Sequence, residues 1–116
     1  MKRDDDYIRQ MLLDMEASKD MHLVAPLMMS MTPDEEKQYQ HAELLCDAGL
    51  FARVNKGVYR MTNQGHDYLA VIRDNSIWSK TKKGASDVGG VTLGILKDIA
   101  VAYVKQEASK KLGIEL

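Results

Sequence analysis

Cysteine is almost absent from this chain, which has Cys46 as its only thiol. One thiol cannot form a disulfide within the chain, so the disulfide-stapled frameworks of small secreted domains are excluded. The first residues, MKRDDDYIRQ, place three acids where a signal peptide requires an apolar segment. Both features predict a reducing, cytoplasmic setting.

Long apolar runs are also missing. The two longest, HLVAPLMM and IAVAYV, are far shorter than the roughly 20 residues that span a bilayer, so no membrane partner is expected. An excess of either charge is missing as well, since 16 basic and 17 acidic residues give a net charge of -1. Binding to nucleic acid would therefore need a local basic patch.

What the chain does have is the length and composition of one folded module. Its 116 residues are 45% hydrophobic and 28% charged, which suits a single core and argues against disorder. The local patterns predict an α+β, mainly α fold. We expect a winged-helix-like domain at residues 1–79 with a short β-hairpin wing, a flexible linker at 80–91 and an appended C-terminal helix at 92–116.

The first predicted helix reaches from Asp4 to about Ala17. The Asp4 carboxylate can accept backbone N–H groups as an N-cap, and Asp5 and Asp6 complement the helix dipole. This interpretation of the three acids is preferred to a cation site, which would need a glycine-turned loop. One helical stripe is predicted to face the core, namely Tyr7, Ile8, Met11, Leu12 and Met15.

The stretch from Met21 to Met31 has an ambiguous pattern. It is apolar but interrupted by Pro26, which favours a short strand with an edge proline over the remnant of a helix. Met28, Met29 and Met31 are most simply interpreted as adaptable core residues, with a plastic binding surface as the alternative.

The next segment carries the strongest local signals. Thr32 precedes Pro33, a pairing of a hydroxyl N-cap with an N1 proline that starts a helix. Glu35 completes a capping box, and Gly49 supplies the left-handed residue that ends this helix after Ala48.

A hairpin, or wing, is predicted after that helix. Its strands are residues 51–54 and 58–61, joined by a turn at 55–57. Thr62 then caps another helix. The apolar face of that helix consists of Gly65, Leu69 and Ile72, with Tyr68 on its flank.

The C-terminal third is expected to be a linker and a helix. Residues 80–91 combine three lysines with three glycines, which is typical of a flexible linker. A helix is predicted from Thr92 to about Leu112, with a polar second half that frays. Its apolar face is wider than one core contact requires, which indicates a homodimer. The residues assigned to this interface are Leu93, Ile95, Leu96, Ile99 and Tyr103.

Two resemblances accompany these predictions. QHAELLCDAGLF followed by a hairpin resembles the recognition helix and wing of bacterial winged-helix regulators. More specifically, MKRDDDYIRQMLL, TNQGHDYLAVIRDNSIWSK and the ending KKLGIEL resemble, over nearly the whole chain, an uncharacterised family of small bacterial and phage proteins, domain of unknown function number twenty-five thirteen. The combination of Gly65-His66, Ile72-Arg73-Asp74 and Ile77-Trp78 is distinctive.

The family resemblance implies a winged-helix-like fold and frequent occurrence in prophages, and it lends no activity. The chain also departs from ordinary winged helices. A helix-turn-helix needs a supporting helix before its recognition helix, and only residues 21–31 are available for it.

The first functional hypothesis is a non-enzymatic, DNA-associated regulator of phage or prophage type. Glutamine and histidine can read base edges, and cations on the wing can contact the phosphates of double-stranded DNA. The residues assigned to DNA are Lys37, Gln38, Gln40, His41, Arg53, Lys56 and Arg60. A second basic group consists of Lys80, Lys82 and Lys83.

The alternative hypothesis is a protein-protein interaction module that binds no DNA and has a host or phage protein as its partner. The exposed stripe of the helix that starts at Pro33 is acidic, which repels phosphates and suits a basic protein surface. The residues assigned to this surface are Glu36, Glu43 and Asp47.

No pattern in the sequence indicates a catalytic, cofactor or metal site. The three histidines lack metal-ligand spacing to one another and to Cys46. Nothing near Cys46 marks an activated nucleophile, and Gly89-Gly90 lacks the lysine of a phosphate loop. We therefore expect no enzymatic activity, no cofactor and no metal.

Overall fold

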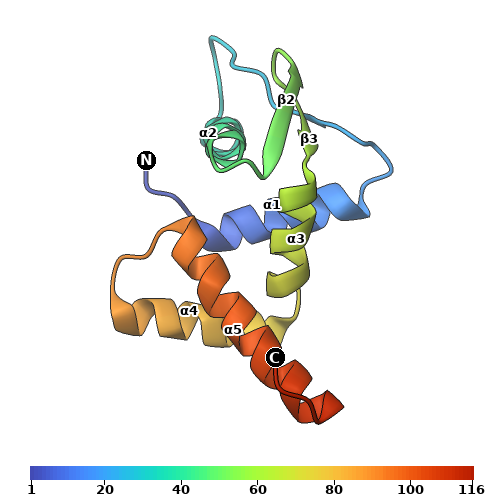
Figure 1. The fold of residues 1–116 in the computed structure, drawn as a ribbon. Helices are drawn as coiled ribbons and strands as arrows, with labels where there is room; N and C mark the ends of the chain where they lie inside the picture. The colour runs from blue at the N-terminus through green and yellow to red at the C-terminus, as the bar shows by residue number, and fades with distance from the viewer. The chain divides into compact units, whose positions relative to one another are not determined.

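A computed structural model describes residues 1–116. It contains five helices and three short strands (Figure 1). In chain order these are α1 (Asp5–Ala17), β1 (Leu23–Val24), α2 (Pro33–Asp47), β2 (Phe51–Asn55), β3 (Val58–Met61), α3 (Asn63–Ile72), α4 (Asn75–Val88) and α5 (Leu93–Leu112). The predicted α+β, mainly α class is therefore confirmed. None of the helices combines the length and the apolar character that crossing a membrane requires.

The chain forms two compact units rather than a domain, a linker and a helix. Unit 1 is Met1–Leu69 and unit 2 is Ala70–Leu116, so the boundary falls within α3. The predicted boundaries at residues 79 and 80 are wrong. They were set by the run of lysines and glycines, whereas α4 continues through that run and packs on α5.

Unit 1 contains a small antiparallel sheet with the strand order β1, β3, β2. Leu23 pairs with Tyr59 in β3, which confirms the strand interpretation of this apolar stretch. The strand is short because Pro26 follows it and has no N–H to donate. No helix lies between β1 and α2, so the supporting helix of an ordinary helix-turn-helix is absent.

Local capping explains where α2 begins and ends. Thr32 Oγ1 accepts the N–H of Glu35 at 3.2 Å, and the Glu35 carboxylate accepts the N–H of Thr32 at 3.1 Å. At the other end Gly49 adopts φ of 77°, a left-handed conformation that side chains disfavour. The predicted capping box and glycine stop are both confirmed.

The core of unit 1 is built from the inner faces of its helices and the sheet. Its fully buried side chains include Ile8, Leu12, Leu45, Tyr59 and Leu69. Tyr7 and Met15 are only half-buried, because they lie at the edge of the α1 stripe. The interpretation of Met28 and Met29 as core residues is wrong, since both are exposed.

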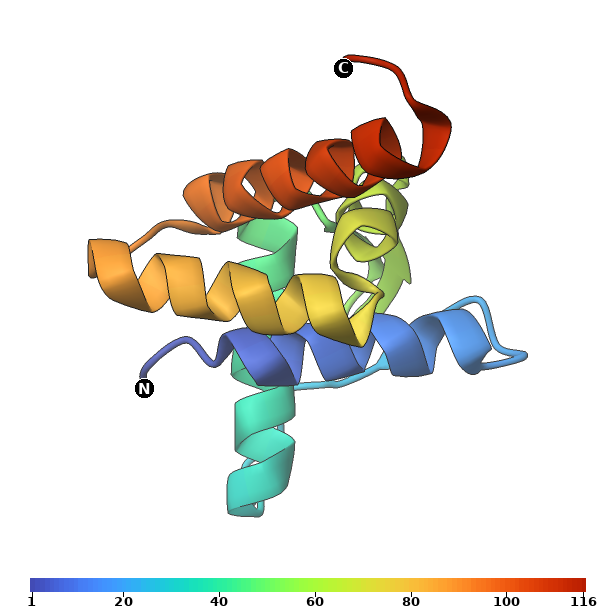
Figure 2. The same ribbon diagram turned by 90° about the horizontal axis from the view of Figure 1, so that it is seen from below.

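Unit 2 is a helical hairpin of α4 and α5, which lie side by side in Figures 1 and 2. Asp74 caps α4 by accepting the Ile77 N–H at 2.9 Å, so the chain breaks between α3 and α4. The linker prediction is wrong because α4 has buried anchors. Thr81 is fully buried and donates a hydrogen bond to the Ile77 carbonyl at 2.7 Å. Gly84 leaves room for Ile99, whose methyl group would lie 3.5 Å from an added Cβ.

The predicted start and end of α5 are confirmed. Thr92 accepts the Ile95 N–H at 3.1 Å, and Gly113, with φ of 67°, ends the helix after Leu112. The polar second half, which was expected to fray, is helical. The assignment of Leu96 to a dimer interface is wrong, because this side chain is 1% exposed.

The other residues assigned to the dimer interface differ in how much surface they offer. Ile99 and Tyr103 lie against Gly84 of α4. Helix α4 therefore covers much of the apolar face of α5 that was assigned to a homodimer. Ile95 keeps 45% of its surface exposed, and Leu93 is half-buried.

Candidate functional site

The cation that α2 was expected to offer to DNA is held within unit 1. Lys37 Nζ donates to Asp4 Oδ2 at 2.9 Å and lies 4.6 Å from the ring centroid of Tyr7. The bond from Lys37, followed by the N–H of Tyr7, lowers the pKa of Asp4 below its ordinary value of 3.8. This pair therefore ties the start of α1 to α2.

His41 is buried rather than exposed on α2. Its Nε2 accepts the N–H of Asp4 at 2.9 Å, and its Nδ1 lies 2.9 Å from the carbonyl oxygen of Lys37. Because a carbonyl can only accept, Nδ1 is the donor to Lys37, while Nε2 is the acceptor of the Asp4 N–H. The assignment of His41 to base reading is wrong, since both ring nitrogens are engaged inside the protein.

A second cluster fastens the hairpin to α2. The Glu43 carboxylate accepts hydrogen bonds from both the Arg53 guanidinium and the Tyr59 hydroxyl. Burial, followed by the bond to Glu43, raises the pKa of Tyr59 to about 12. The carboxylate assigned to a protein partner and the guanidinium assigned to phosphate are therefore partners of each other.

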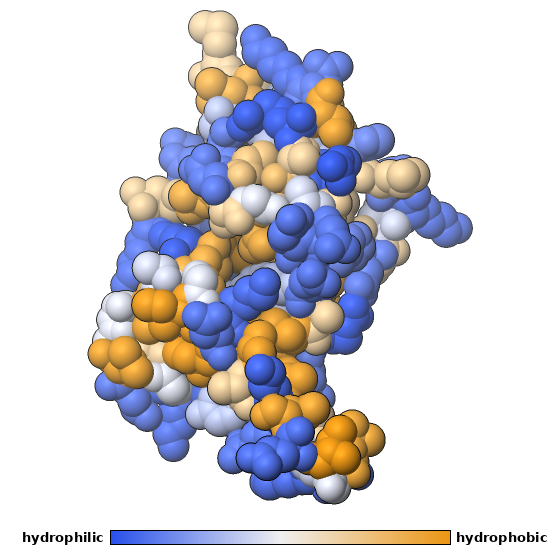
Figure 3. Space-filling model, viewed as in Figure 1, coloured by the Kyte–Doolittle hydropathy of each residue, from blue (hydrophilic) through white to orange (hydrophobic).

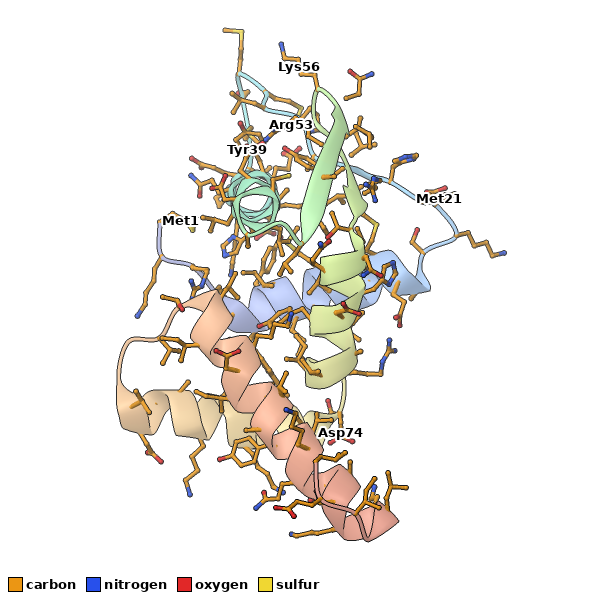
Figure 4. The ribbon with its side chains drawn as sticks, in the orientation of Figure 1. Met1, Met21, Tyr39, Arg53, Lys56 and Asp74 are labelled. Carbon is orange, nitrogen blue, oxygen red and sulfur yellow. The ribbon has the colours of Figure 1, made fainter.

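Of the remaining residues assigned to DNA, Lys56 and Arg60 lie on the hairpin and Gln38 and Gln40 on α2. Figure 4 shows Lys56 at the tip of the hairpin and Arg53 lower on β2. Arg60 is exposed and its Nη1 lies 3.4 Å from the Met61 carbonyl oxygen. Gln40 is half-buried on α2 and borders a different depression from Gln38.

Acid is expected to weaken the Glu43 cluster. The bonds from Tyr59 and Arg53 lower the pKa of Glu43 below its ordinary value of 4.5, so the stabilisation is complete above that pH and is lost as the pH falls through the folded-state pKa. Urea unfolding of the wild type and Glu43→Gln should therefore show a difference in stability at about pH 6 that shrinks by about pH 3. A difference that stays constant with pH would contradict the assigned role of this carboxylate.

An exposed apolar segment precedes α2. We call residues 21–31 the methionine loop. Met29 is fully exposed, and Met21 and Leu27 keep 80% and 68% of their surface in solvent. On the face shown in Figure 3, apolar side chains lie among hydrophilic ones near the hairpin tip. Apolar surface of this kind on a small unit is typical of an interaction site.

The methionine loop is anchored to the hairpin turn. The N–H of Ala25 donates to the carbonyl oxygen of Gly57 at 2.8 Å, and Ala25 is 4% exposed. Gly57 has φ of 70°, and a Cβ on it would lie 2.7 Å from the Pro26 Cα atom. The chain therefore passes directly over this turn, which places residues 25 and 26 of the loop beside the wing.

A cavity of about 280 Å³ lies along α1, and we call it the α1 groove. Its apolar lining consists of Tyr7, Met11, Met15 and Leu23. Its polar lining consists of Gln10, Asp14, Ser18, His22 and Gln38. Gln10 Nε2 donates to Asp14 Oδ1 at 2.8 Å, which holds that carboxylate in place. The groove thus combines an apolar wall with the carboxylate of Asp14.

A family model described as "Hypothetical protein (DUF2513)" matches residues 2–92. The chain belongs to the DUF2513 family. The DUF2513 match covers unit 1 and α4 and ends at Thr92, the N-cap of α5, so the resemblance noted in the C-terminal segment lies beyond it. Searches of curated proteins and of solved structures give no match.

Within the DUF2513 region, sequence reasoning missed the α1 groove. Tyr7 and Met15 were assigned to the core and Gln38 to DNA. A signal was available, because Tyr7, Met11 and Met15 recur every four residues and so form a row beside the Ile8 and Leu12 row. The second signal was the lack of a helix pattern in residues 21–31, and in the structure Tyr7 and Met15 at the two ends of the row are only half-buried.

Proposed function

We propose that unit 1 is a non-enzymatic protein-binding module. The observation that carries this proposal is the exposure of the methionine loop, where Met21, Leu27 and Met29 face solvent. Apolar side chains at such positions contribute nothing to the core, whereas covering them with a partner removes apolar surface from water. Methionine suits this role because its unbranched side chain adapts to different surfaces.

The charges of unit 1 support a protein partner over DNA. Lys37 and Arg53 are paired with Asp4 and Glu43, so DNA phosphates would have to displace carboxylates that are already in place. The exposed positions of α2 are acidic, including Glu36 at its start and Asp47 at its end. An acidic helix repels the DNA backbone and attracts a basic protein surface.

A second candidate function is contact with DNA through the wing. Lys56 and Arg60 favour it, because both are exposed on the hairpin. In this case α2 would not enter the major groove of DNA. Binding would depend on contacts with phosphates rather than on contacts with base edges. The prediction of a phage or prophage-type regulator stays a prediction under either candidate.

Photo-crosslinking in the cells that encode the protein tests the proposal. A benzophenone amino acid replaces Met29 in one variant and Lys83, an exposed residue of α4, in a matched control. We expect irradiation to give a discrete adduct with a protein from position 29 and none from position 83. The mass of the adduct distinguishes a second copy of the chain from another protein.

The contradicting result combines two observations. The first is that no adduct forms at position 29. The second is that the protein shifts a random-sequence DNA duplex in a gel at low salt, at protein concentrations up to about 100 µM, which is the range of non-specific binding. Loss of that shift in Lys56→Glu and Arg60→Glu would then establish the wing as a DNA contact.

A further inference from the structure

The size of the α1 groove limits what it can hold. Its volume of about 280 Å³ lies just under the range of roughly 300–1,000 Å³ that is typical of sites for drug-sized ligands and cofactors. One long side chain of a protein partner is a better match. The groove is elongated, because Tyr7, Met11 and Met15 follow one another along successive turns of α1.

The lining selects the chemistry of that side chain. The aromatic and thioether groups of Tyr7, Met11 and Met15 provide an apolar wall, on which an aliphatic stem can lie. Asp14 provides a carboxylate beyond that wall, and its Oδ1 atom is already held by Gln10. A ligand with an apolar stem and a cationic end satisfies both parts at once.

The charges around the groove are also negative. Besides burial, which is the largest cause, the fields of Asp34 and Asp14 raise the pKa of the Tyr7 hydroxyl, and Asp4 adds to them. The opposing field comes from Lys37, but Lys37 is paired with Asp4. Of these charged groups only Asp14 lines the groove, and its carboxylate attracts a cation placed there.

We propose that the α1 groove binds one arginine side chain of a partner protein, with its stem along Tyr7 and Met11 and its guanidinium on Asp14. Arginine fits better than lysine, because its planar group can donate two parallel bonds to a carboxylate and can stack on an aromatic ring. Gln38 on α2 adds a side-chain carbonyl for a further N–H of the guanidinium. This inference rests on the proposed protein-binding function and names the chemistry of the partner.

The test is an NMR titration of the full-length ¹⁵N-labelled chain with blocked arginine, N-acetyl-arginine N-methylamide. We expect saturable shifts at the amides of residues 7–18, 22 and 23, with a dissociation constant on the order of 1 mM, because one side chain buries little area. Blocked citrulline has the same shape without the charge, and we expect it to bind about 10-fold more weakly. Blocked lysine should also bind more weakly than blocked arginine.

Two variants locate the site. Asp14→Asn should weaken arginine binding about 10-fold or more, since it removes the charge from the acceptor. Asp67→Asn is the matched control, because it removes an exposed acid of the same unit that does not line the groove, and it should leave the affinity unchanged. Well-dispersed spectra of both variants verify that they are folded.

Three results would overturn the inference: equal binding of arginine and citrulline, unchanged affinity in Asp14→Asn, or stronger binding of lysine than of arginine. The outcome is separable from that of the proposed function. A chain that crosslinks through position 29 but does not bind arginine keeps its role as a protein-binding module and loses only the arginine site.

Discussion

Replacing Gly65 by alanine is expected to destabilise unit 1 by about 3 kcal/mol, at the upper end of what overpacking usually costs. An added Cβ would lie 2.3 Å from the carbonyl oxygen of Leu50 and 2.7 Å from Cγ of Met61. The Leu50 carbonyl cannot simply withdraw, since it accepts the Thr62 N–H at 3.0 Å, the bond that joins the end of α2 to the start of α3. Urea unfolding followed by circular dichroism measures the loss.

Gly84→Ala provides the matched control for this substitution. Gly84 also lies inside a helix, but an added Cβ would meet its nearest neighbours in Ile99 and Tyr103 at 3.5 Å, an ordinary contact distance. With no clash, the better helix propensity of alanine should stabilise the protein by about 0.5–1 kcal/mol. Equal effects of the two substitutions, in either direction, would contradict the close approach of α3 to residue 50.

The segments that the sequence predicted well are those whose signals are local. The capping box of Thr32 and Glu35, the glycine stop at Gly49 and the cap at Thr62 each involve residues within a few positions of one another. Such bonds depend on residue type and spacing, so they can be recognised in the amino-acid sequence. The boundaries of α2 and the start of α3 followed from them.

The failures involve contacts between residues far apart in the chain. Nothing in the sequence pairs Lys37 with Asp4, or Arg53 with Glu43, and without those pairs both cations appeared free for DNA. The prediction of a flexible linker failed for a related reason. The glycine and lysines of α4 look flexible by composition, whereas the fold buries Thr81 and uses Gly84 for close packing with α5.

These long-range ion pairs occupy two of the cations that had been assigned to DNA. Ion pairs inside unit 1 engage Lys37 and Arg53. The exposed apolar methionine loop and the α1 groove, which has one carboxylate in its lining, become the most distinctive surfaces of the unit. Both surfaces belong to unit 1, in which no helix lies between β1 and α2. A basic, partly apolar protein segment is therefore the kind of partner that would complete this unit.

In unit 2, replacing Leu96 by alanine is expected to cost about 3 kcal/mol of stability. Leu96 is 1% exposed and belongs to the apolar face of α5, next to the fully buried Ala100. Removing its isobutyl group loses the transfer free energy of the buried methyl groups and leaves a cavity that the rigid helical hairpin closes only in part. Thermal and urea unfolding of the purified variant measure the loss.

Ile95→Ala is the matched control, because Ile95 is adjacent in sequence yet 45% exposed, so truncating it should change the stability by no more than about 0.5 kcal/mol. The pair also tests the dimer that the sequence suggested. If α5 were a dimer interface through Ile95, the stability of the wild type would rise with the logarithm of the protein concentration, and Ile95→Ala would weaken that dependence. A large loss in Leu96→Ala that is independent of concentration, with almost none in Ile95→Ala, identifies this face of α5 as the core of a single chain.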